Sequence, residues 1–280
     1  MEILKGLPVA NAINEKITEK LKDWKGSLPH LAIVRVGERP DDLSYERGAS
    51  KKMEKVGMEY SIHAFPADID NETFQKEFDK INDNPEVDGI LLLRPLPKHL
   101  DEKAIENRIN PGKDLDGISP MNLAKVYAGD DTGYAPCTAE AVIEMLDFAG
   151  VDLKGKRVAV VGRSLVIGKP VSMLLMKKNA TVTVCHTKTV DMPGTCKNAE
   201  IVVAAAGVAK MLDKSYVADG AVVIDVGINV DEAGNLCGDV NFDDICETAA
   251  LATPVPGGVG SVTTSVLAKH LLKAAKNKSY

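Results

Sequence analysis

Residues 158–170 form the segment with the clearest chemical potential. An apolar run, expected as a strand, leads into Gly162, Arg163 and Ser164, and a helix is expected to begin near Gly168. Glycines let the backbone approach a pyrophosphate, and the free N–H groups at a helix start attract negative charge. The spacing of the two glycines is one residue longer than in the common GxGxxG pattern, so an ordinary turn is the alternative. We favour a dinucleotide site.

The residues after the next expected strand indicate which dinucleotide would bind. NAD sites usually place Asp or Glu at the end of this strand, where it holds the ribose 2′-hydroxyl. Here Cys185 is followed by His186, Thr187 and Lys188, with no acid. Hydroxyls and cations suit a 2′-phosphate, to which Arg163 could also contribute. We therefore expect NADP, with a solvated strand end as the alternative for the histidine and the lysine.

A second group of chemically capable residues follows the first apolar strand. Tyr45, Ala49 and Lys52 recur at helical spacing and therefore share one helix face. A tyrosine and a lysine on one face can handle protons, because burial lowers the pKa of a lysine. A solvent-exposed basic helix is the alternative, and we prefer it for Lys51 and Lys55.

Two further stretches combine glycine with groups that could contact a substrate. Residues 113–117 place Asp114 and Asp116 beside a lysine, where the carboxylates could accept substrate N–H groups or simply shape a turn. Residues 254–260 contain two prolines and three glycines. They form either a stiff loop with exposed N–H groups at a domain cleft or a bare turn.

Alternating strands and helices must position these residues. The expected strands are 31–36, 60–65, 89–93, 157–161, 180–185, 201–205 and 221–226, and the expected helices are 44–56, 71–81, 139–150 and 263–276. Continuous aliphatic strands are typical of parallel sheets covered by helices on both faces. Residues 114–138, rich in Gly, Pro, Asp and Asn, are expected to form a loop or domain junction. The sequence thus predicts an α/β protein with a Rossmann-like second half.

The composition excludes several other classes of protein. Of 280 residues, 45% are hydrophobic and 26% charged, the balance of a globular protein, and no apolar run approaches the roughly 18 residues of a membrane span. The charged N-terminal stretch is unlike a signal peptide, so a cytoplasmic location is expected. A net charge of −6 argues against nucleic acid or acidic membranes as partners. Five scattered cysteines without a CxxC pair fit neither a disulfide framework nor a zinc site, so no metal is expected.

Taken together, these motifs resemble the bifunctional methylenetetrahydrofolate dehydrogenase/methenyltetrahydrofolate cyclohydrolase family. The matching segments are Val36-Gly37, Ser44-Tyr45, Gly89–Leu91, Pro95–Pro97, Lys113–Gly117, Pro136–Thr138, Gly162–Ser164, Gly168–Pro170, Ala180–Thr183, Cys185–Thr187, Asp225–Asn229, Gly238–Val240 and Thr253–Gly260. The resemblance implies NADP-dependent oxidation of 5,10-methylenetetrahydrofolate to 5,10-methenyltetrahydrofolate, followed by hydrolysis to 10-formyltetrahydrofolate.

The resemblance also implies an organisation and a set of site residues. A folate-binding catalytic domain over 1–120, joined by a last helix at about 263–280, would face an NADP-binding domain over 121–262, with the folate in the cleft between them. Homodimers would form through the cofactor domains. Tyr45 would stack on the folate and Asp116 would hydrogen-bond its pterin. The remaining implied contacts are Gly257, Gly258 and Val259 for folate, and Gly162, Arg163, Ser164, Gly168, Thr187 and Ile228 for NADP.

Two departures from the family pattern concern the hydrolytic step. Ala49 stands where a catalytic lysine is usual, and Leu93 stands where a glutamine is usual. Three accounts follow: a dehydrogenase with little cyclohydrolase activity, a proton carried by Lys52 from one turn further along, or full activity by other means. Arg94 could supply charge but not act as a base.

Two functions of other kinds are also compatible with the sequence. One is a catalytically idle regulatory protein that binds folate or NADP. The other is an unrelated NADP reductase built like shikimate dehydrogenase. The intact loop around Arg163 and the carboxylate of Asp116 argue against the first. Asp116 within residues 113–117 and the glycine-rich loop of residues 254–260 argue against the second.

Overall fold

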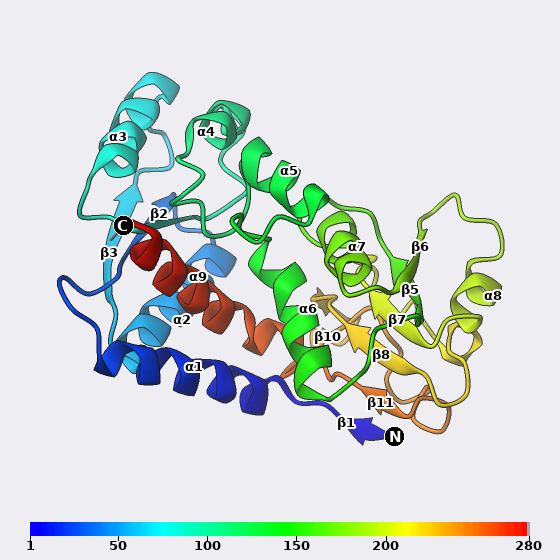
Figure 1. Ribbon diagram of the computed structural model, residues 1–280. Coiled ribbons are helices and arrows are strands. Elements are labelled where there is room, and N and C mark those ends of the chain that lie inside the picture. Colours follow the sequence, from blue (N-terminus) through cyan, green and yellow to red (C-terminus); the bar gives the residue numbers. More distant parts are fainter. Residues whose placement is uncertain (279–280) are drawn as a thin grey trace. The chain divides into compact units, whose positions relative to one another are not determined.

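The computed structural model describes residues 1–278 and divides the chain into two compact units, each described here by itself (Figure 1). Unit 1 comprises Met1–Asn11 and Thr138–Thr263, and unit 2 comprises Ala12–Cys137 and the chain from Thr264 onward. The chain therefore passes from one unit to the other three times.

Unit 1 is built on a six-stranded sheet in which all paired strands are parallel. The strands, in spatial order, are β1 (Glu2–Ile3), β11 (Leu251–Ala252), β8 (Val222–Asp225), β7 (Ile201–Ala204), β5 (Arg157–Val161) and β6 (Thr181–Cys185). The central strands β5 and β7 are almost entirely buried, which explains their unbroken aliphatic sequences. β6 is more exposed because it forms an edge of the sheet.

Helices and short turns complete unit 1. The elements are α6 (Cys137–Phe148), α7 (Gly168–Lys177), α8 (Met192–Lys197), the 3₁₀ turns Lys214–Tyr216 and Val259–Ser261, and an antiparallel pair β9 (Asn229–Val230) and β10 (Leu236–Cys237). Helix α1 (Gly6–Lys22) begins in unit 1 and continues into unit 2.

Unit 2 holds a three-stranded parallel sheet in the order β3 (Glu59–Phe65), β2 (His30–Val36), β4 (Gly89–Leu92). Its further helices are α2 (Pro40–Val56), α3 (Asn71–Asp83), α4 (Glu102–Arg108), α5 (Pro120–Ala128) and α9 (Thr263–Lys278). A parallel bridge between Ile90 and Asp114 sets the segment after α4 beside β4, so that Asp116 lies near the carboxyl end of that strand.

Most predicted elements are present, but the expected loop over 114–138 is wrong in part because it contains α5. Ser119 caps this helix by accepting a hydrogen bond from the Asn122 amide at 3.2 Å, Pro120 occupies its first turn, and Gly129 ends it with φ of +71°. The polar and glycine residues that suggested a loop are thus helix-end signals. Residues 279–280 of the expected last helix lie outside the described residues.

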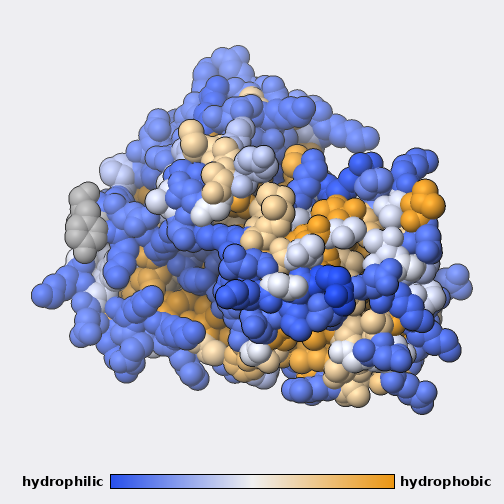
Figure 2. All heavy atoms as spheres, turned by 45° about the vertical axis from the view of Figure 1, so that its right-hand side comes forward, coloured by the Kyte–Doolittle hydropathy of each residue, from blue (hydrophilic) through white to orange (hydrophobic). Residues whose placement is uncertain are grey.

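Each unit has its own apolar core. In unit 2, Phe74 packs edge-on against Phe65 and at a tilt against Phe78, with ring centroids 5.5 and 6.3 Å apart. Polar and charged side chains cover most of the face drawn in Figure 2, with smaller apolar areas among them. Among the described residues, no helix is both long enough and apolar enough to cross a membrane.

Candidate functional site

The dinucleotide motif lies at one edge of the unit 1 sheet. The strands β5, β6, β7 and β8 are parallel, so the loops that follow them emerge together at their carboxyl ends. Along the chain β5 is followed by β6 and then β7, but in the sheet β6 and β7 lie on opposite sides of β5. Ligands of such sheets bind where the strand order reverses in this way. Gly162, Thr187 and Ile228, which belong to three of these loops, are therefore at the edge that the sequence predicts for a cofactor.

The loop after β5 depends on both of its glycines. Gly162 has φ of +129°, and a side chain there would overlap the carbonyl oxygen of Ala205. A side chain at Gly168 would overlap the carbonyl oxygen of Gly162. Ser164 Oγ accepts hydrogen bonds from the amides of Ile167 and Gly168 at 3.1 and 3.4 Å, so it shapes the start of α7. The backbone is thereby held in a tight turn that a side chain at either glycine would disrupt.

The loop after β6 offers donors and no carboxylate at its start. Thr187 and Lys188 are exposed, and His186 is half-buried. The His186 amide donates to Thr189 Oγ1 at 2.8 Å, and the Lys188 amide donates to His186 Nδ1 at 3.1 Å. Arg163 on the neighbouring loop is also exposed. These residues suit a phosphate better than a ribose hydroxyl.

Two buried aspartates at the same edge were not anticipated from the sequence. Asp225 ends β8 and accepts hydrogen bonds from the amides of Gly227, Asp239 and Val240 at 2.9–3.0 Å. Burial raises the pKa of Asp225 to about 6, although these amides oppose the rise. The carboxylate therefore ties together the loop that carries Ile228 and the segment after β10.

Asp239 extends this support to the loop after β7. Its carboxylate accepts the amides of Ala206, Gly207 and Val208 at 2.6–3.0 Å, and the side-chain amide of Asn229 at 2.9 Å. Both aspartates lie within the matched segments 225–229 and 238–240. Only the three-dimensional contacts reveal that they hold the cofactor edge in shape.

The glycine-proline loop after β11 packs against the start of α1 within unit 1. The Gly6 amide donates to the carbonyl of Gly257 at 2.8 Å, and a side chain at Gly258 would overlap the carbonyl oxygen of Pro254. Gly257 is exposed with φ of +96°, whereas Val259 is 2% exposed. Of the three residues, Gly257 presents its backbone to solvent and Val259 anchors the loop.

In unit 2, the residues of the 113–117 motif divide into two roles. Asp114 accepts the amides of Ile118 and Ser119 and the side-chain amide of Asn122, at 2.8–3.0 Å, so it organises the start of α5. Lys113 Nζ donates to two backbone carbonyls, those of residues 82 and 84. Of the two carboxylates expected to accept substrate N–H groups, Asp114 is thus occupied by the protein's own donors, which leaves Asp116.

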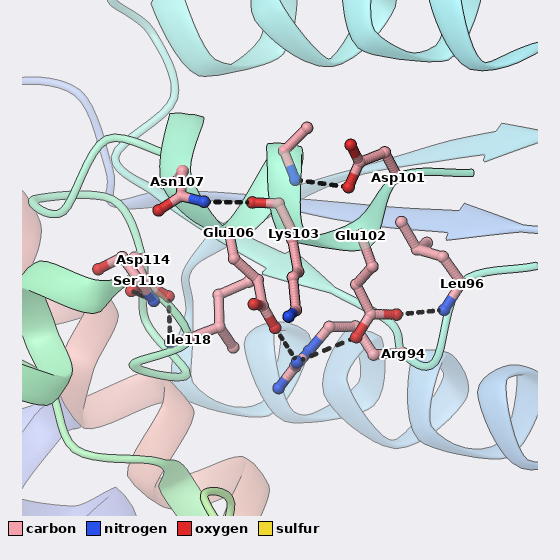
Figure 3. A network of polar contacts seen from close by, with 11 residues as sticks. Arg94, Leu96, Asp101, Glu102, Lys103, Glu106, Asn107, Asp114, Ile118 and Ser119 are labelled. Carbon is pink, nitrogen blue, oxygen red and sulfur yellow. Dashed lines mark hydrogen bonds and ion pairs between the residues drawn. The ribbon is translucent and has the colours of Figure 1, made fainter. Parts of the chain in front are cut away.

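Asp116 is half-buried near the carboxyl end of β4. Its Oδ1 accepts the Cys137 amide at 2.9 Å. Burial raises the pKa of Asp116, while this hydrogen bond and the charge of Arg94 oppose the rise. Arg94 Nη1 in turn donates to Glu106 Oε1 at 2.8 Å and to Glu102 Oε1 at 3.3 Å, both on α4 (Figure 3). Arg94 thus pairs with the carboxylates of α4, and its charge also lowers the pKa of Asp116.

The helix face predicted to carry Tyr45, Ala49 and Lys52 exists on α2. Tyr45 is half-buried and Ala49 is fully buried. Lys52 Nζ lies 3.4 Å from Asn14 Oδ1 on α1, and burial, followed by the charge of Lys55, lowers the pKa of Lys52. Lys52 is therefore turned toward α1, in an environment where its ammonium loses a proton more readily than that of an exposed lysine.

A buried ion pair beside Tyr45 was missed by the sequence analysis. Arg35 Nε donates to Glu46 Oε2 at 2.8 Å, and the side chains are 10% and 11% exposed. Arg35 lies on a strand and Glu46 on a helix eleven positions later, so no helical or strand periodicity in the sequence indicates that they pair. Within residues 1–278, no group of three His, Cys, Asp or Glu side chains could hold a metal ion.

Comparison with known proteins covers the whole chain. The family model described as "Tetrahydrofolate dehydrogenase/cyclohydrolase, catalytic domain" matches residues 4–116, and the NAD(P)-binding domain of the same family matches residues 136–279. The bifunctional protein FolD of Clostridioides difficile (strain 630) is 53% identical over 98% of this chain and 96% of its own length.

Solved structures give the same result. The bifunctional FolD enzyme of Campylobacter jejuni has 34% identity and a TM-score of 0.95, with 99% of each chain covered. A Trypanosoma brucei FolD complexed with NADP cofactor and inhibitor has 36% identity and a TM-score of 0.92, with 99% of this chain and 98% of that one covered. Shikimate dehydrogenase of Aquifex aeolicus, at 14% identity and a TM-score of 0.54, shares the fold alone. The chain belongs to the tetrahydrofolate dehydrogenase/cyclohydrolase family.

Proposed function

We propose that this protein oxidises 5,10-methylenetetrahydrofolate to 5,10-methenyltetrahydrofolate with NADP⁺ as the hydride acceptor. The observation that carries the proposal is the glycine-dependent loop of residues 162–168 at the carboxyl end of β5, in a chain that matches this family over residues 4–116 and 136–279. Bound NADP⁺ supplies the ring that accepts a hydride from the folate methylene carbon. No proton leaves in this step, so the protein contributes alignment.

The cofactor edge of unit 1 suits NADP in particular. The exposed Arg163 and Thr187 can meet a 2′-phosphate, and no acid follows β6 to take a ribose 2′-hydroxyl. We assign the other cofactor contacts to Gly162, Ser164, Gly168 and Ile228, and the NADP domain to residues 121–262. Ile228 is 65% exposed at this edge, as an apolar contact for a cofactor would be.

For folate, we assign the catalytic domain to residues 1–120 with the last helix. Tyr45 offers an aromatic ring for stacking, and the Asp116 carboxylate offers an acceptor for pterin N–H groups. Gly257, Gly258 and Val259 are assigned to the same substrate on the family resemblance.

The hydrolysis of the methenyl product needs a group that moves protons. Ala49 is fully buried and Leu93 is 6% exposed, so neither position offers one. Lys52, with its lowered pKa, is one candidate, although its ammonium contacts Asn14. Lys52→Met tests it directly: if Lys52 carries the proton, the variant loses hydrolysis and keeps the dehydrogenase step.

We also propose a cytoplasmic homodimer joined through unit 1. The edge strand β6 has its outer side unpaired within the described sheet, and the exposed Val184 and Val190 lie on it and just after it. Such an edge pairs readily with a second copy. Light scattering on the purified protein measures the mass: a dimer is expected, and a monomer at all concentrations would contradict the proposal.

The test of the proposed function is an assay of both half-reactions on one preparation. Methylenetetrahydrofolate and NADP⁺ together should produce NADPH absorbance, and omission of either should abolish it. A protein that binds both ligands without forming NADPH would instead be the catalytically idle regulatory protein.

A further inference from the structure

The Arg35–Glu46 ion pair is an unusual feature of unit 2 because both of its side chains are buried. Arg35 Nε contacts Glu46 Oε2 at 2.8 Å, and a second guanidinium nitrogen donates to the carbonyl oxygen of Gly37. A buried ion pair is a poor source of stability, because an apolar pair of similar size is often as stabilising or more so. Stabilising the contact between α2 and β2 therefore does not explain why the chain has a buried ion pair here, and a chemical role is the alternative.

The ion pair lies close to Ala49 and Leu93, the two positions where the family usually has the lysine and the glutamine of the hydrolytic step. Glu46 follows Tyr45 directly and precedes Ala49 by three residues, so it shares a helix face with the position that usually carries the lysine. Arg35 is the penultimate residue of β2, and Leu93 donates its amide to the carbonyl of Val34 beside it. The charged pair thus occupies the same corner of unit 2 as the two apolar replacements.

The carboxylate of Glu46 keeps a free acceptor. Oε2 is engaged by Arg35, while Oε1 accepts no hydrogen bond from any described residue. A carboxylate with one oxygen fixed by a guanidinium and the other available can take a proton from a bound water in a defined orientation.

We propose that Glu46, positioned by Arg35, is the acid–base group of the cyclohydrolase step in this chain. The inference rests on the proposed function. Arg35 is a positioning residue: it holds one oxygen of the Glu46 carboxylate while its guanidinium is itself held by the carbonyl of Gly37.

The proposed step balances without a further reactant. The water oxygen bonds to the cationic methenyl carbon, and one water proton passes to Glu46. The bond from this carbon to one folate nitrogen then breaks, with its electron pair staying on the nitrogen, which takes the proton back from Glu46. The remaining hydroxyl proton goes to solvent as the formyl C=O forms.

The first test is Glu46→Gln, with both half-reactions measured on the same preparation. A positioned acid–base group contributes typically about 10²–10⁴-fold, so the cyclohydrolase rate should fall by that factor. Hydride transfer needs no protein base, so the dehydrogenase rate should change little.

A second variant guards against misfolding, because Glu46→Gln leaves the Arg35 charge buried and unpaired. In the double variant Arg35→Met/Glu46→Leu, the pair is replaced by apolar side chains, which preserves or raises the thermal midpoint. It should fold, retain dehydrogenase activity and lose hydrolysis. The matched control removes another ion pair of unit 2, Arg108 with Asp79 at 2.7 Å between α4 and α3, by Arg108→Met/Asp79→Leu, and should keep both activities.

Three results would overturn the inference. One is an equal loss of both activities in the folded double variant, which would make the pair a scaffold for substrate binding. Another is hydrolysis that survives the double variant and disappears in Lys52→Met. The third is a wild-type protein with dehydrogenase activity and no hydrolysis. Absence of both activities from the wild type would refute the proposed function itself.

Discussion

Replacing Asp225 with asparagine should change how the stability of this protein depends on pH. The carboxyl group has a pKa of about 6 in the folded protein, against an ordinary value of 3.8, because burial and the neighbouring Asp239 raise it more than the three amides lower it. The raised pKa adds stability that is fully present below pH 3.8 and lost as the pH rises through 6. A difference of about two in pKa corresponds to about 3 kcal/mol.

Asparagine keeps the shape of this group and cannot titrate. With its oxygen at Oδ1 it still accepts the amides of Gly227 and Asp239, and only the bond to Val240 is lost. Urea unfolding of both proteins at several pH values between 4 and 7 compares their free energies of unfolding. The wild type should lose most of these roughly 3 kcal/mol relative to Asp225→Asn across this range. Other acids titrate in both proteins and cancel, so two parallel curves would refute the reasoning.

Four further substitutions test the assigned sites. Arg163→Ala should weaken NADP binding about ten- to a hundredfold and NAD binding less, because a charge-assisted bond to the 2′-phosphate contributes roughly 1.5–3 kcal/mol; equal losses in titrations with the two cofactors would reject this role. Asp116→Ala leaves pterin N–H groups unpaired, so folate-dependent turnover should fall while the NADP dissociation constant stays unchanged; turnover near that of the wild type would contradict it. Arg94→Met removes the charge that lowers the pKa of Asp116, so the acid limb of the pH profile of kcat/KM should move to higher pH, and an unmoved limb would exclude this influence. Ala49→Lys places an ammonium at a fully buried position near Arg35, so the thermal midpoint should fall, and a midpoint at or above that of the wild type would contradict the placement.

Local sequence patterns predicted the strands well because burial on both faces leaves a continuous trace. β5 was predicted at its observed bounds, and β7 within one residue at one end. β6 was predicted equally closely although it is an exposed edge strand, so burial does not explain its prediction. β1 and β11 were not predicted, because a strand of two residues is too short to show an alternation of apolar and polar residues. α5 escaped because its start and end signals, Ser119 and Gly129, resemble turn residues.

The site was predictable where one motif carries one function and not where distant residues cooperate. Gly162 and Gly168 stand six residues apart, and the motif that contains them predicted a strand, a glycine loop and a helix start, all of which the structure shows. Asp225 and Asp239 serve amides in three loops, a relation that exists only after the sheet has formed. The same holds for Arg35 and Glu46, whose contact depends on α2 packing against β2.

The threefold passage of the chain between units has a consequence for synthesis on the ribosome. β11, at residues 251–252, lies between β8 and β1, so the first strand made has no neighbour until nearly the whole chain has been translated. The fold of unit 2 is also incomplete until α9 has been synthesised, since Lys273 Nζ on this helix donates to the carbonyls of Asp131 and Gly133. Contacts of such long sequence separation form late. Neither unit can therefore complete its fold co-translationally, and a ribosome stalled shortly before residue 250 would carry a nascent chain that proteases still cleave in both units.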